Sequence, residues 1–318
     1  MMSIKYCEVT TLFSYWRFII TTLFFLFTAQ THAAKLAIVI DDFGYRHNTE
    51  MQVLNMPVQI TIAILPNAPL RKEMMTKAHQ QGREIIIHVP MLPISKQPLE
   101  KDTLKPTMTS AEIERIIDHA VANVPYAKGI NNHMGSAMTA DLAAMQKLMK
   151  ALEKHHFFFL DSVTTGKTQA TKAAQNTNVS VLKRNVFLDD NIDEAAVLAQ
   201  FNQAIKLARR NGSAIAIGHP HPSTVKVLKQ MLPNLPADIQ LVKLSDLLND
   251  KSVQDKDPTI SNPVDIPLTS KSWVSFIFPC LAELPVYTEN APQCTTLFDT
   301  MRAKFTKVTT IQNTIESK

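Results

Sequence analysis

The sequence contains little glycine, with seven residues among 318, and this scarcity excludes several cofactor-binding motifs. Neither a G-x-G-x-x-G sequence nor a P-loop is present, so the loops that bind dinucleotides and nucleoside triphosphates are absent. A G-x-S-x-G sequence is absent too, which excludes the nucleophile elbow of the serine hydrolases. The sequence therefore argues against a nucleotide cofactor and against a covalent serine nucleophile.

Cysteine is also rare, because the chain contains only Cys7, Cys280 and Cys294. None of them lies in a spacing typical of a zinc site, so we expect no cysteine-ligated metal. Cys7 belongs to the N-terminal leader described below. In an exported chain Cys280 and Cys294 can close a small disulfide loop, and the alternative is a pair of free thiols.

The sequence lacks a basic run with interleaved aromatic residues, which is the pattern of many nucleic-acid binding proteins. Its formal net charge is +5, and residues 1–33 contribute two basic side chains and one acidic one. Without residues 1–33 the net charge is +4, which is mild for a chain of this length. We therefore expect no nucleic-acid partner, and the charge indicates at most an association with an anionic cell envelope.

The first residues have the layout of a secretory signal peptide. Lys5 and Arg17 precede or flank an apolar stretch at residues 18–29, and Thr31 and Ala33 are small residues at the −3 and −1 positions of a cleavage site. The apolar stretch is shorter than the roughly 20 residues of a membrane-spanning helix. We therefore predict a periplasmic or secreted protein, with an uncleaved N-terminal anchor as the alternative.

The chain from residue 35 to residue 249 alternates between short apolar segments and amphipathic ones, which is the pattern of a parallel α/β sheet or barrel. The apolar segments are rich in β-branched residues, as buried parallel strands are. The predicted strands are Lys35–Ile40, Gln59–Leu65, Glu84–Val89, Lys128–Asn132, Phe157–Leu160, Val179–Lys183, Ser213–Gly218 and Ile239–Val242. The length suits a single (β/α) barrel, since such barrels need about 200 residues or more.

Two of the intervening segments carry strong helix signals. Thr109 and Glu112 form a capping box, and apolar residues follow at the i, i+3, i+4, i+7 spacing of a core-facing helix. A second helix is predicted at residues 192–210, and Gly212 follows its end. The inward stripe of this second helix consists of Leu198, Phe201, Ile205 and Ala208.

Two segments interrupt the alternation. Residues 90–108 contain four prolines and no periodicity. An irregular loop of this length after a strand predicts one wall of a binding groove, with a surface excursion as the alternative. Beyond residue 249 the chain becomes polar and linker-like. We therefore predict a signal peptide at 1–33, a barrel domain at 34–249, and a linker with a C-terminal tail of unknown role at 250–318.

Chemically active side chains recur where the predicted strands end. Asp41 and Asp42 follow the first strand, and His88, His133 and His219 end three later ones. The carboxyl ends of parallel strands meet on one side of the fold, where α/β proteins place their sites. Carboxylate oxygens and imidazole nitrogens suit Zn²⁺ or a similar divalent ion, and a carboxylate beside it can accept a proton. This pattern indicates a metal-dependent hydrolytic site.

Each of these residues also has a structural interpretation. A carboxylate after a strand can cap the next helix, and a histidine at a strand end can be a core residue. His133 follows two asparagines and can belong to a hydrogen-bonded loop network. Helix caps do not explain histidines at three strand ends, so a shared site is the stronger hypothesis.

Four short motifs carry a family resemblance. They are Val-Ile-Asp-Asp-Phe-Gly at residues 39–44, His-Val-Pro-Met at 88–91, Asn-Asn-His-Met-Gly-Ser at 131–136 and Gly-His-Pro-His-Pro at 218–222. Together they resemble the motifs of the polysaccharide deacetylases, which are NodB-related carbohydrate esterases, and most closely those of the divergent YibQ-like exported branch. The resemblance covers residues 35–249 in the same order, and the tail lies outside it.

This resemblance implies a fold, a metal and a division of labour. The implied fold is a distorted (β/α)7–8 barrel of the polysaccharide deacetylase type, and the implied cofactor is one divalent ion, with Zn²⁺ expected. The metal would activate water to remove N- or O-acetyl groups from a polysaccharide. Asp42 and His88 match metal ligands of the family, Asp41 matches the general base, and His219 matches the acid that protonates the leaving amine or alcohol.

The sequence departs from the ordinary deacetylases at two places. Leu92 stands where they have a second histidine, and Asn131 or Asn132 stands where they have an arginine. We expect His133 to supply the third metal ligand from the neighbouring strand end, and Arg184 to supply the missing positive charge. A third group of residues is expected to support the ligands or contact the substrate: Asn132, Asp161, Asp189 and His221.

The favoured hypothesis is an exported, metal-dependent deacetylase that acts on acetyl groups of envelope carbohydrate. The missing second histidine and the missing arginine motivate an alternative, an inactive module that binds glycan or protein on the same scaffold. A metallohydrolase that acts on another bond, such as an amide or phosphoester, is a further alternative, because a fold alone does not determine a reaction.

Overall fold

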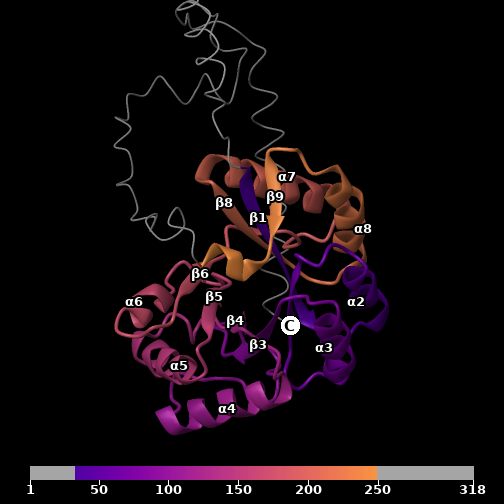
Figure 1. Cartoon of the computed structure of the whole chain (residues 1–318). Coiled ribbons are helices and arrows are strands. Elements are labelled where there is room, and N and C mark those ends of the chain that lie inside the picture. The colour runs from indigo at the N-terminus through magenta and orange to yellow at the C-terminus, as the bar shows by residue number, and fades with distance from the viewer. Residues whose placement is uncertain (1–32, 249–318) are drawn as a thin grey trace, which may run out of the picture. The chain divides into compact units, whose positions relative to one another are not determined.

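A computed structural model describes residues 33–248 of the chain (Figure 1). Within this range the strands form one nine-stranded sheet in the order β6-β5-β4-β3-β2-β1-β8-β7, with β9 beside β1, and every pair is parallel. The strands are β1 (Ala34–Phe43), β2 (Thr61–Ile64), β3 (Ile85–Met91), β4 (Gly129–Met134), β5 (Phe158–Asp161), β6 (Val181–Lys183), β7 (Val186–Phe187), β8 (Ser213–Gly218) and β9 (Ile239–Val242).

The sheet curls because its two edge strands are consecutive in the chain. β6 pairs with β5 at one edge and β7 pairs with β8 at the other, and only Arg184 and Asn185 separate them. The backbone N–H of Arg184 donates to Asp161 of β5, while that of Asn185 donates to Ile215 of β8. One segment thus joins both edges, and the predicted distorted (β/α) barrel is confirmed.

The central strand β1 uses both of its edges. One edge pairs with β8 along residues 35–40. The other edge pairs with β9 at residues 34–37 and with β2 further along, from Val39 to Phe43. The two short strands β2 and β9 therefore share one side of β1.

The helices form an outer layer around the strands (Figure 1). They are α2 (His47–Leu54), α3 (Arg71–Gln80), α4 (Ser110–Asn123), α5 (Leu142–Lys154), α6 (Ala170–Ala174), α7 (Glu194–Asn211) and α8 (Pro222–Met231), with 3-10 turns η1 (Leu232–Asn234) and η2 (Leu244–Leu247). Thr109 and Glu112 form the predicted capping box of α4, and Gly212 ends α7 with a φ of 85°. Both helix predictions are confirmed.

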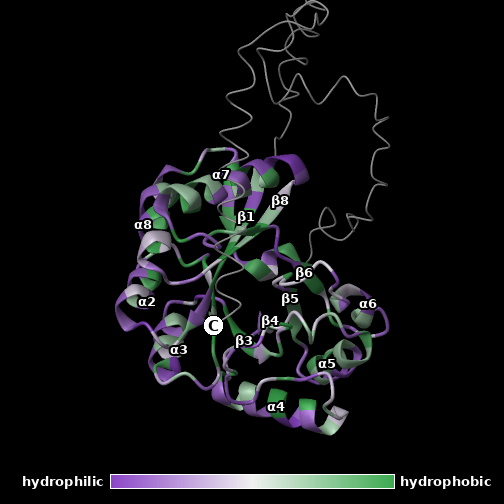
Figure 2. Ribbon diagram, turned by 180° about the vertical axis from the view of Figure 1, so that it is seen from behind, coloured by the Kyte–Doolittle hydropathy of each residue, from purple (hydrophilic) through white to green (hydrophobic). Residues whose placement is uncertain are grey.

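Alternation along the strands separates two hydrophobic layers. On β1, Leu36, Ile38 and Ile40 pack against the helices, in the large cluster that also holds Phe201 of α7. The intervening Ala37 and Val39 belong to a smaller cluster made of strand residues and η2, which lies inside the curl. Figure 2 shows the hydrophobic strands at the centre and two-sided helices around them. The parity of a residue therefore says whether it faces the helices or the interior.

The predicted strand boundaries shift by a few residues, and one strand was not predicted. β3 and β4 extend two residues beyond their expected ends, so β3 includes Pro90. The short β7, Val186–Phe187, has no counterpart in the prediction. Residues 90–108 return to β3, where Leu92 N–H donates to the Leu104 carbonyl and Leu104 N–H to the Pro90 carbonyl. β7 pairs with β8, and the loop pairs with β3 through a single bridge between Met91 and Leu104. Both pairings are short and join residues that are distant in the sequence.

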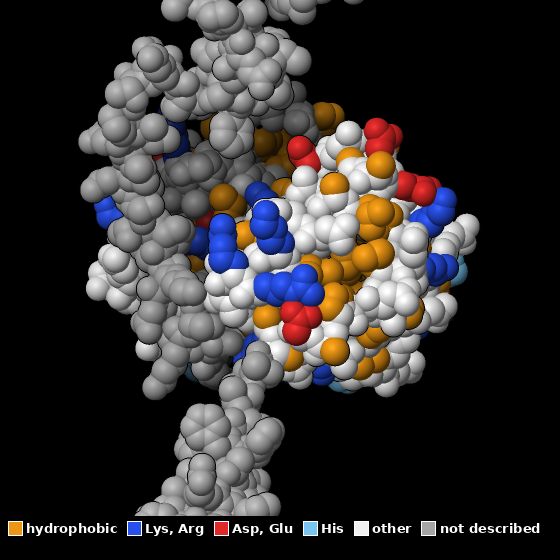
Figure 3. Space-filling view, turned by 90° about the horizontal axis from the view of Figure 1, so that it is seen from above, with side chains coloured by type: hydrophobic (Ala, Val, Ile, Leu, Met, Phe, Trp, Pro, Cys, Tyr) orange, Lys and Arg blue, Asp and Glu red, His pale blue; other side chains and the backbone are white. Residues whose placement is uncertain are grey.

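Other predictions concern parts of the chain beyond this range. The signal peptide, apart from residue 33, and the tail with Cys280 and Cys294 lie outside the described residues. Among residues 33–248 no helix has the length and apolarity that crossing a membrane requires. On the face seen in Figure 3, acidic and basic side chains are interspersed with exposed hydrophobic ones.

Candidate metal centre and active site

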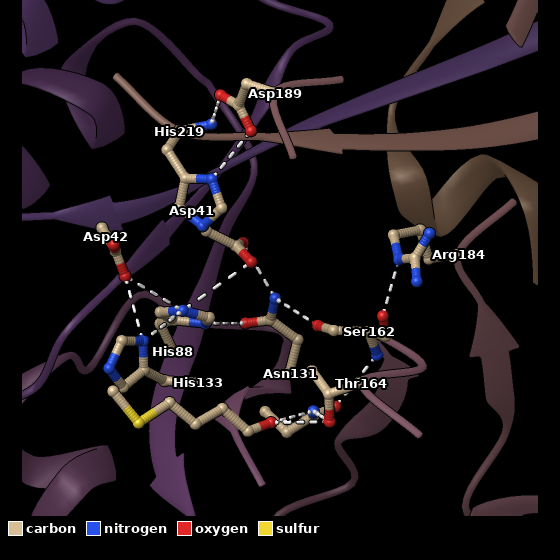
Figure 4. A network of polar contacts seen from close by, with 12 residues as sticks. Asp41, Asp42, His88, Asn131, His133, Ser162, Thr164, Arg184, Asp189 and His219 are labelled. Atoms are coloured by element: carbon tan, nitrogen blue, oxygen red, sulfur yellow. Dashed lines mark hydrogen bonds and ion pairs between the residues drawn. The ribbon is translucent and has the colours of Figure 1, made fainter. Parts of the chain in front are cut away.

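The candidate site lies inside the curl, at the carboxyl ends of the strands. Asp41 continues the interior parity of Ala37 and Val39 on β1. By the same alternation His88 of β3 faces the interior as Ile86 does. His219, directly after β8, faces it as Ile215 and Ile217 do. On β4 it selects Asn131 and His133, because Ile130 packs in the outer layer. The polar residues at the carboxyl ends of β1, β3, β4 and β8 therefore lie close together (Figure 4).

Asp42 joins the site through an irregularity in β1. Its parity would direct it outward, but the pairing register with β2 shifts between Ile40 and Phe43, so Asp41 and Asp42 stand opposite the single residue Ala63. Asp42 also has a φ of 57°, in the left-handed region. A bulge with a left-handed residue re-aims the side chain. Both carboxylates consequently face the interior.

Asp42, His88 and His133 form a compact triangle of ligand atoms. Asp42 Oδ1 lies 3.2 Å from His88 Nε2 and 3.1 Å from His133 Nδ1, and the two nitrogens are 3.1 Å apart. Ligand atoms bound to zinc at about 2.0–2.1 Å in a tetrahedral site lie at a similar spacing, roughly 3.3 Å. Asp42 Oδ1 is buried without a hydrogen-bond partner. These three residues fit a divalent ion, with one carboxylate oxygen and two imidazole nitrogens as donors.

The charge state of Asp42 suits a metal ligand. Burial opposes ionisation, but the adjacent imidazoles of His133 and His88 hold the pKa of Asp42 far below its usual range. The carboxylate is therefore ionised at neutral pH. A negative oxygen that faces two ring nitrogens, with no hydrogen bond of its own, is the arrangement that a bound cation completes.

Asn131 connects the ligand triangle to Asp41. Its Nδ2 donates to Asp41 Oδ1 at 2.8 Å and lies 3.3 Å from Ser162 Oγ. This fixes the amide orientation, so Asn131 Oδ1 faces His88 Nδ1 at 2.8 Å and accepts its hydrogen. His88 Nε2 then presents its lone pair to the triangle, as an outer partner of a metal-bound histidine should ensure. Asn131 is fully buried.

Asp41 lies beside the triangle without belonging to it. Its Oδ2 is 3.7 Å from His88 Nε2, a distance too long for a hydrogen bond. Burial raises the pKa of Asp41, although His88, His219 and Asn131 oppose this shift. A buried carboxylate with a raised pKa accepts a proton more readily than an ordinary one.

His219 lies across from the triangle and is held by Asp189. His219 Nδ1 is 2.9 Å from Asp189 Oδ1, and the backbone N–H of His219 donates to Asp189 Oδ2 at 2.6 Å. The Thr224 hydroxyl also donates to Oδ2, and Phe187 stacks on the imidazole. Burial disfavours the charged ring, but the Asp189 hydrogen bond and the charges of Asp41 and Asp189 raise the pKa of His219 to about 9. The ring is thus protonated at neutral pH.

Asp189, His219 and His221 form a second group with metal-ligand atoms close together. Their atoms already have partners. Both Asp189 oxygens accept hydrogen bonds from His219, and Oδ2 also accepts from Thr224. His221 Nδ1 lies 2.8 Å from a nitrogen of the Arg46 guanidinium, which can only donate. The Asp42 triangle is therefore the better candidate for a metal.

The remaining expected residues lie around the site rather than in it. Asn132 has outward parity, accepts from the Ser162 N–H and donates to the Met134 carbonyl. Asp161 also has outward parity, accepting from the Val163 N–H and the Thr168 hydroxyl. These contacts shape the loop after β5, and the amide that reaches the ligands is Asn131 instead of Asn132.

Arg184 serves the same loop. Its side chain donates to the carbonyls of Ser162 and Val163 at 2.6 and 2.9 Å, and its guanidinium lies over the Phe187 ring. Burial lowers the pKa of Arg184, although nearby Asp161, Asp190 and Asp41 oppose this shift. The hydrogen bonds of Arg184 go to this loop, so its charge reaches Asp41 only as a through-space electrostatic interaction.

Sequence reasoning left Asn131 without a role of its own and missed Glu50. Asn131 could have been found by its spacing of two from His133, which places both on one face of β4. Glu50 is fully buried, and its Oε1 accepts from the N–H groups of Gly44, Tyr45 and Arg46 at 3.0, 2.9 and 2.6 Å. It fixes the loop that follows Asp42, and no sequence pattern marks this role.

Comparisons with known proteins identify the family of the chain. The family model described as divergent polysaccharide deacetylase matches residues 38–248. The chain belongs to this family. The chain is 60% identical, over 255 residues, to the uncharacterized protein YibQ of Escherichia coli (strain K12), and the match covers 80% of each chain.

Two further relatives extend the likeness. An uncharacterized protein of Haemophilus influenzae is 46% identical over 236 residues, which cover 74% of this chain and 84% of that protein. The crystal structure of an uncharacterized protein from Agrobacterium tumefaciens C58 aligns with a TM-score of 0.64 at 20% identity, covering 69% of this chain and 91% of that one. At this identity the structural likeness concerns the fold alone.

Proposed function

We propose that the protein is an exported, metal-dependent deacetylase that hydrolyses N- or O-acetyl groups of envelope carbohydrate. One observation supports this proposal most strongly: the ligand atoms of Asp42, His88 and His133 converge beside the buried carboxylate of Asp41, and His219, held by Asp189, lies near the same carboxylate (Figure 4). Membership of the divergent polysaccharide deacetylase family supports the reaction class and a carbohydrate substrate.

Asp42, His88 and His133 would hold the divalent ion, for which their oxygen and nitrogen donors suit Zn²⁺. When bound, such an ion lowers the pKa of a water molecule and polarises a carbonyl oxygen. Asn131 maintains the required tautomer of His88 through its Nδ1 hydrogen bond. The ligand set thus uses His133 in place of the histidine that Leu92 replaces.

Asp41 is the proposed general base. As water attacks the acetyl carbonyl carbon, a carboxylate oxygen of Asp41 takes its proton and a C–O bond forms. The Asn131 amide holds Asp41 Oδ1, which leaves Oδ2 to accept the proton. The raised pKa brings the base closer to neutral pH, where proton transfer is most effective.

His219 is the proposed general acid. When the C–N or C–O bond of the acetyl group breaks, His219 Nε2 gives its proton to the leaving nitrogen or oxygen. Asp189 holds Nδ1 and stabilises the charged ring, which favours the imidazolium that this step requires. The acid and the base are therefore two groups with distinct environments, as acid–base chemistry requires.

Export and domain organisation are part of the proposal. The leader at residues 1–33 would direct the chain out of the cytoplasm and be cleaved after Ala33, leaving the barrel at 34–249 and the tail at 250–318. N-terminal sequencing of protein recovered from the cell envelope tests this: Ala34 is expected as the first residue. A chain that begins at Met1 would favour the uncleaved anchor.

The test of the reaction combines metal content with acetate release. Full-length protein is expected to bind about one zinc-like ion per chain, and His133→Ala to lose it. Asp41→Asn is expected to retain the metal while acetate release from acetylated glycans falls by about 100-fold or more. Metal in the wild type without acetate release from any acetylated glycan would favour another hydrolysed bond, and absence of both would favour the inactive binding module.

A further inference from the structure

Arg46 and His221 form a cationic pair beside the proposed acid. The two residues are 175 positions apart, yet Arg46 Nη1 lies 2.8 Å from His221 Nδ1. Because a guanidinium can only donate, His221 Nδ1 accepts this hydrogen bond. In the neutral ring His221 Nε2 then carries the hydrogen. The acceptor of the pair, His221 Nδ1, is therefore occupied by Arg46, and the remaining N–H groups of both side chains are donors.

The charge of Arg46 has no carboxylate partner among residues 33–248. Its side chain makes one hydrogen bond there, the one to His221, and it takes part in no ion pair in that range. Lys226 on α8, by contrast, is paired with Glu194. An exposed arginine held by an imidazole keeps its full positive charge for a ligand. Arginine also has the fork geometry that matches carboxylate and phosphate oxygens.

The backbone around the pair is well fixed. Glu50 Oε1 binds three successive N–H groups, the last of them that of Arg46. His221 precedes α8 as its N-cap, and its N–H donates to the carbonyl of His219. Neither residue needs to order its main chain when a ligand binds, which lowers the entropic cost of binding.

A shallow depression lies beside the pair and is lined in part by Arg46. It has a volume of about 370 Å³, near the lower end of the roughly 300–1,000 Å³ of small-molecule sites. Its lining consists of Arg46, His47, Asn48, Thr49, Pro220 and Pro222. Pro220 and Pro222 of this lining flank His221, whose ring centroid lies 5.8 Å from that of His219. His47, also on this lining, bonds Glu73.

We infer that Arg46 and His221 bind an anionic substituent, a carboxylate or a phosphate, on the sugar next to the one that is deacetylated. This inference rests on the proposed function, because it places the second sugar next to His219, whose ring centroid lies 5.8 Å from that of His221. It makes the preferred substrate an acidic glycan. The depression would select the charged sugar, while the Asp42 triangle and its neighbours act on the acetyl group.

The experiment measures binding of four tetrasaccharides to the full-length protein by calorimetry, in zinc and in chelator. The first alternates N-acetylglucosamine with N-acetylmuramic acid and carries carboxylates. The second is the same molecule with its carboxylates converted to amides, the third is chitotetraose, and the fourth is chitotetraose with a 6-phosphate. The variants are Arg46→Gln, His221→Gln and, as a charge-matched control on α8, Lys226→Gln.

We expect the wild type to prefer a charged probe to its neutral counterpart, and Arg46→Gln to weaken that binding by about tenfold or more. The same variant should leave binding of the neutral probes unchanged, His221→Gln should act in the same direction, and Lys226→Gln should change nothing. The carboxylated and phosphorylated probes distinguish the two anion sources. Equal binding of charged and neutral probes, or equal losses in Arg46→Gln and Lys226→Gln, would contradict the inference.

Binding and turnover separate this inference from the proposed function. If Arg46→Gln selectively weakens charged probes while no probe releases acetate, the anion subsite stands and deacetylation is wrong. If acetate is released equally from charged and neutral probes, deacetylation stands and the subsite is wrong.

Discussion

Asp42 follows Asp41 directly in the chain, yet both carboxylates face the barrel interior because Asp42 has a left-handed backbone. Its φ is 57°, and the register of β1 against β2 shifts at this point. Non-glycine residues rarely adopt this conformation, and aspartate and asparagine tolerate it best. Aspartate therefore suits position 42 for two reasons: it supplies the ligand oxygen, and it tolerates the left-handed backbone.

The first prediction separates these two demands. Asp42→Asn keeps a side chain that tolerates the left-handed region but lacks the anionic oxygen, whereas Asp42→Ala loses both properties. Zinc affinity should fall in both variants by more than about 100-fold, since even outer partners of a ligand cost about 10- to 100-fold. The metal-free Ala variant should also be less stable than the Asn variant by about 1 kcal/mol.

Calorimetric titration with zinc and chemical unfolding of the metal-free proteins check this prediction. Asp42→Gly is the matched control, because glycine accepts a positive φ without strain. It should lose zinc while unfolding nearer to the Asn variant. Retention of wild-type zinc affinity in Asp42→Asn would show that Asp42 is not a ligand.

The second prediction concerns Asn131 and Asn132, whose side chains lie on opposite faces of β4. Asn131→Ala removes the amide between Asp41 and His88, so zinc affinity should fall by about 10- to 100-fold. Asn132→Ala removes contacts to Ser162 and Met134, so it should cost about 1–2 kcal/mol of stability with little change in zinc affinity. Titration and thermal unfolding of both variants would reveal this contrast, and equal zinc losses would contradict it.

Much of the barrel and its site could be predicted because burial imposes a simple pattern. Strands covered on both faces are continuously apolar, so a polar residue at the end of such a strand stands out, as His88 and His219 do. Parallel strands bring these ends together without further information. Strand parity also distinguishes Asn131 from Asn132, although the family motif alone left both open.

Other features depend on contacts between distant residues. The bulge at Asp42 arises from the register of β1 against β2, which the sequence of β1 does not contain. β7 consists of Val186–Phe187 and exists because the curled sheet places it beside β8. Arg46 meets His221 across 175 positions. Such relationships require the three-dimensional arrangement, because no local periodicity specifies them.

The third prediction concerns the charge of His219. In the metal-free protein its pKa of about 9 lies above the ordinary value of 6.5. Burial opposes the shift, and Asp189 is the first partner that produces it. Asp189→Asn should therefore bring the pKa of His219 down toward or below 6.5. NMR titration of the imidazole in both proteins measures this directly, and an unchanged pKa in the variant would contradict the assigned pair.

The same shift has a consequence for stability. Because the folded-state pKa is raised, the charged His219 stabilises the fold fully below about pH 6.5, and this contribution disappears as the pH rises through about 9. Asp189→Asn should remove the contribution, so the two proteins should differ most in stability at pH 6 and least above pH 9. Chemical unfolding of the metal-free proteins across this range checks the sign.

The last prediction concerns Arg83, which lies just before the amino end of β3, whereas the candidate site lies at the carboxyl ends of the strands. It is almost fully buried, and within the described range no carboxylate contacts its guanidinium: the side chain donates to four backbone carbonyls and to a glutamine side chain. The carbonyls are those of Leu54, Met56, Pro57 and Ile60. Burial lowers its pKa to about 10, so it remains charged at neutral pH.

Arg83→Met retains an apolar stem but removes the guanidinium from all four carbonyls. The Leu54 carbonyl keeps the Gln81 amide as a donor and the Pro57 carbonyl keeps the Ile60 N–H, so Met56 and Ile60 are the acceptors that lose their partner. A buried acceptor without a partner costs about 1–3 kcal/mol, so we expect a total of about 3 kcal/mol. Arg210→Met is the control, because that exposed arginine bonds its neighbour Asn211 and no other side chain of residues 33–248, so the variant should cost less than about 0.5 kcal/mol. Zinc affinity should be unchanged in both variants, since Arg83 is remote from the Asp42 triangle. Equal stability of the two variants in urea unfolding would mean that water replaces the guanidinium at these carbonyls.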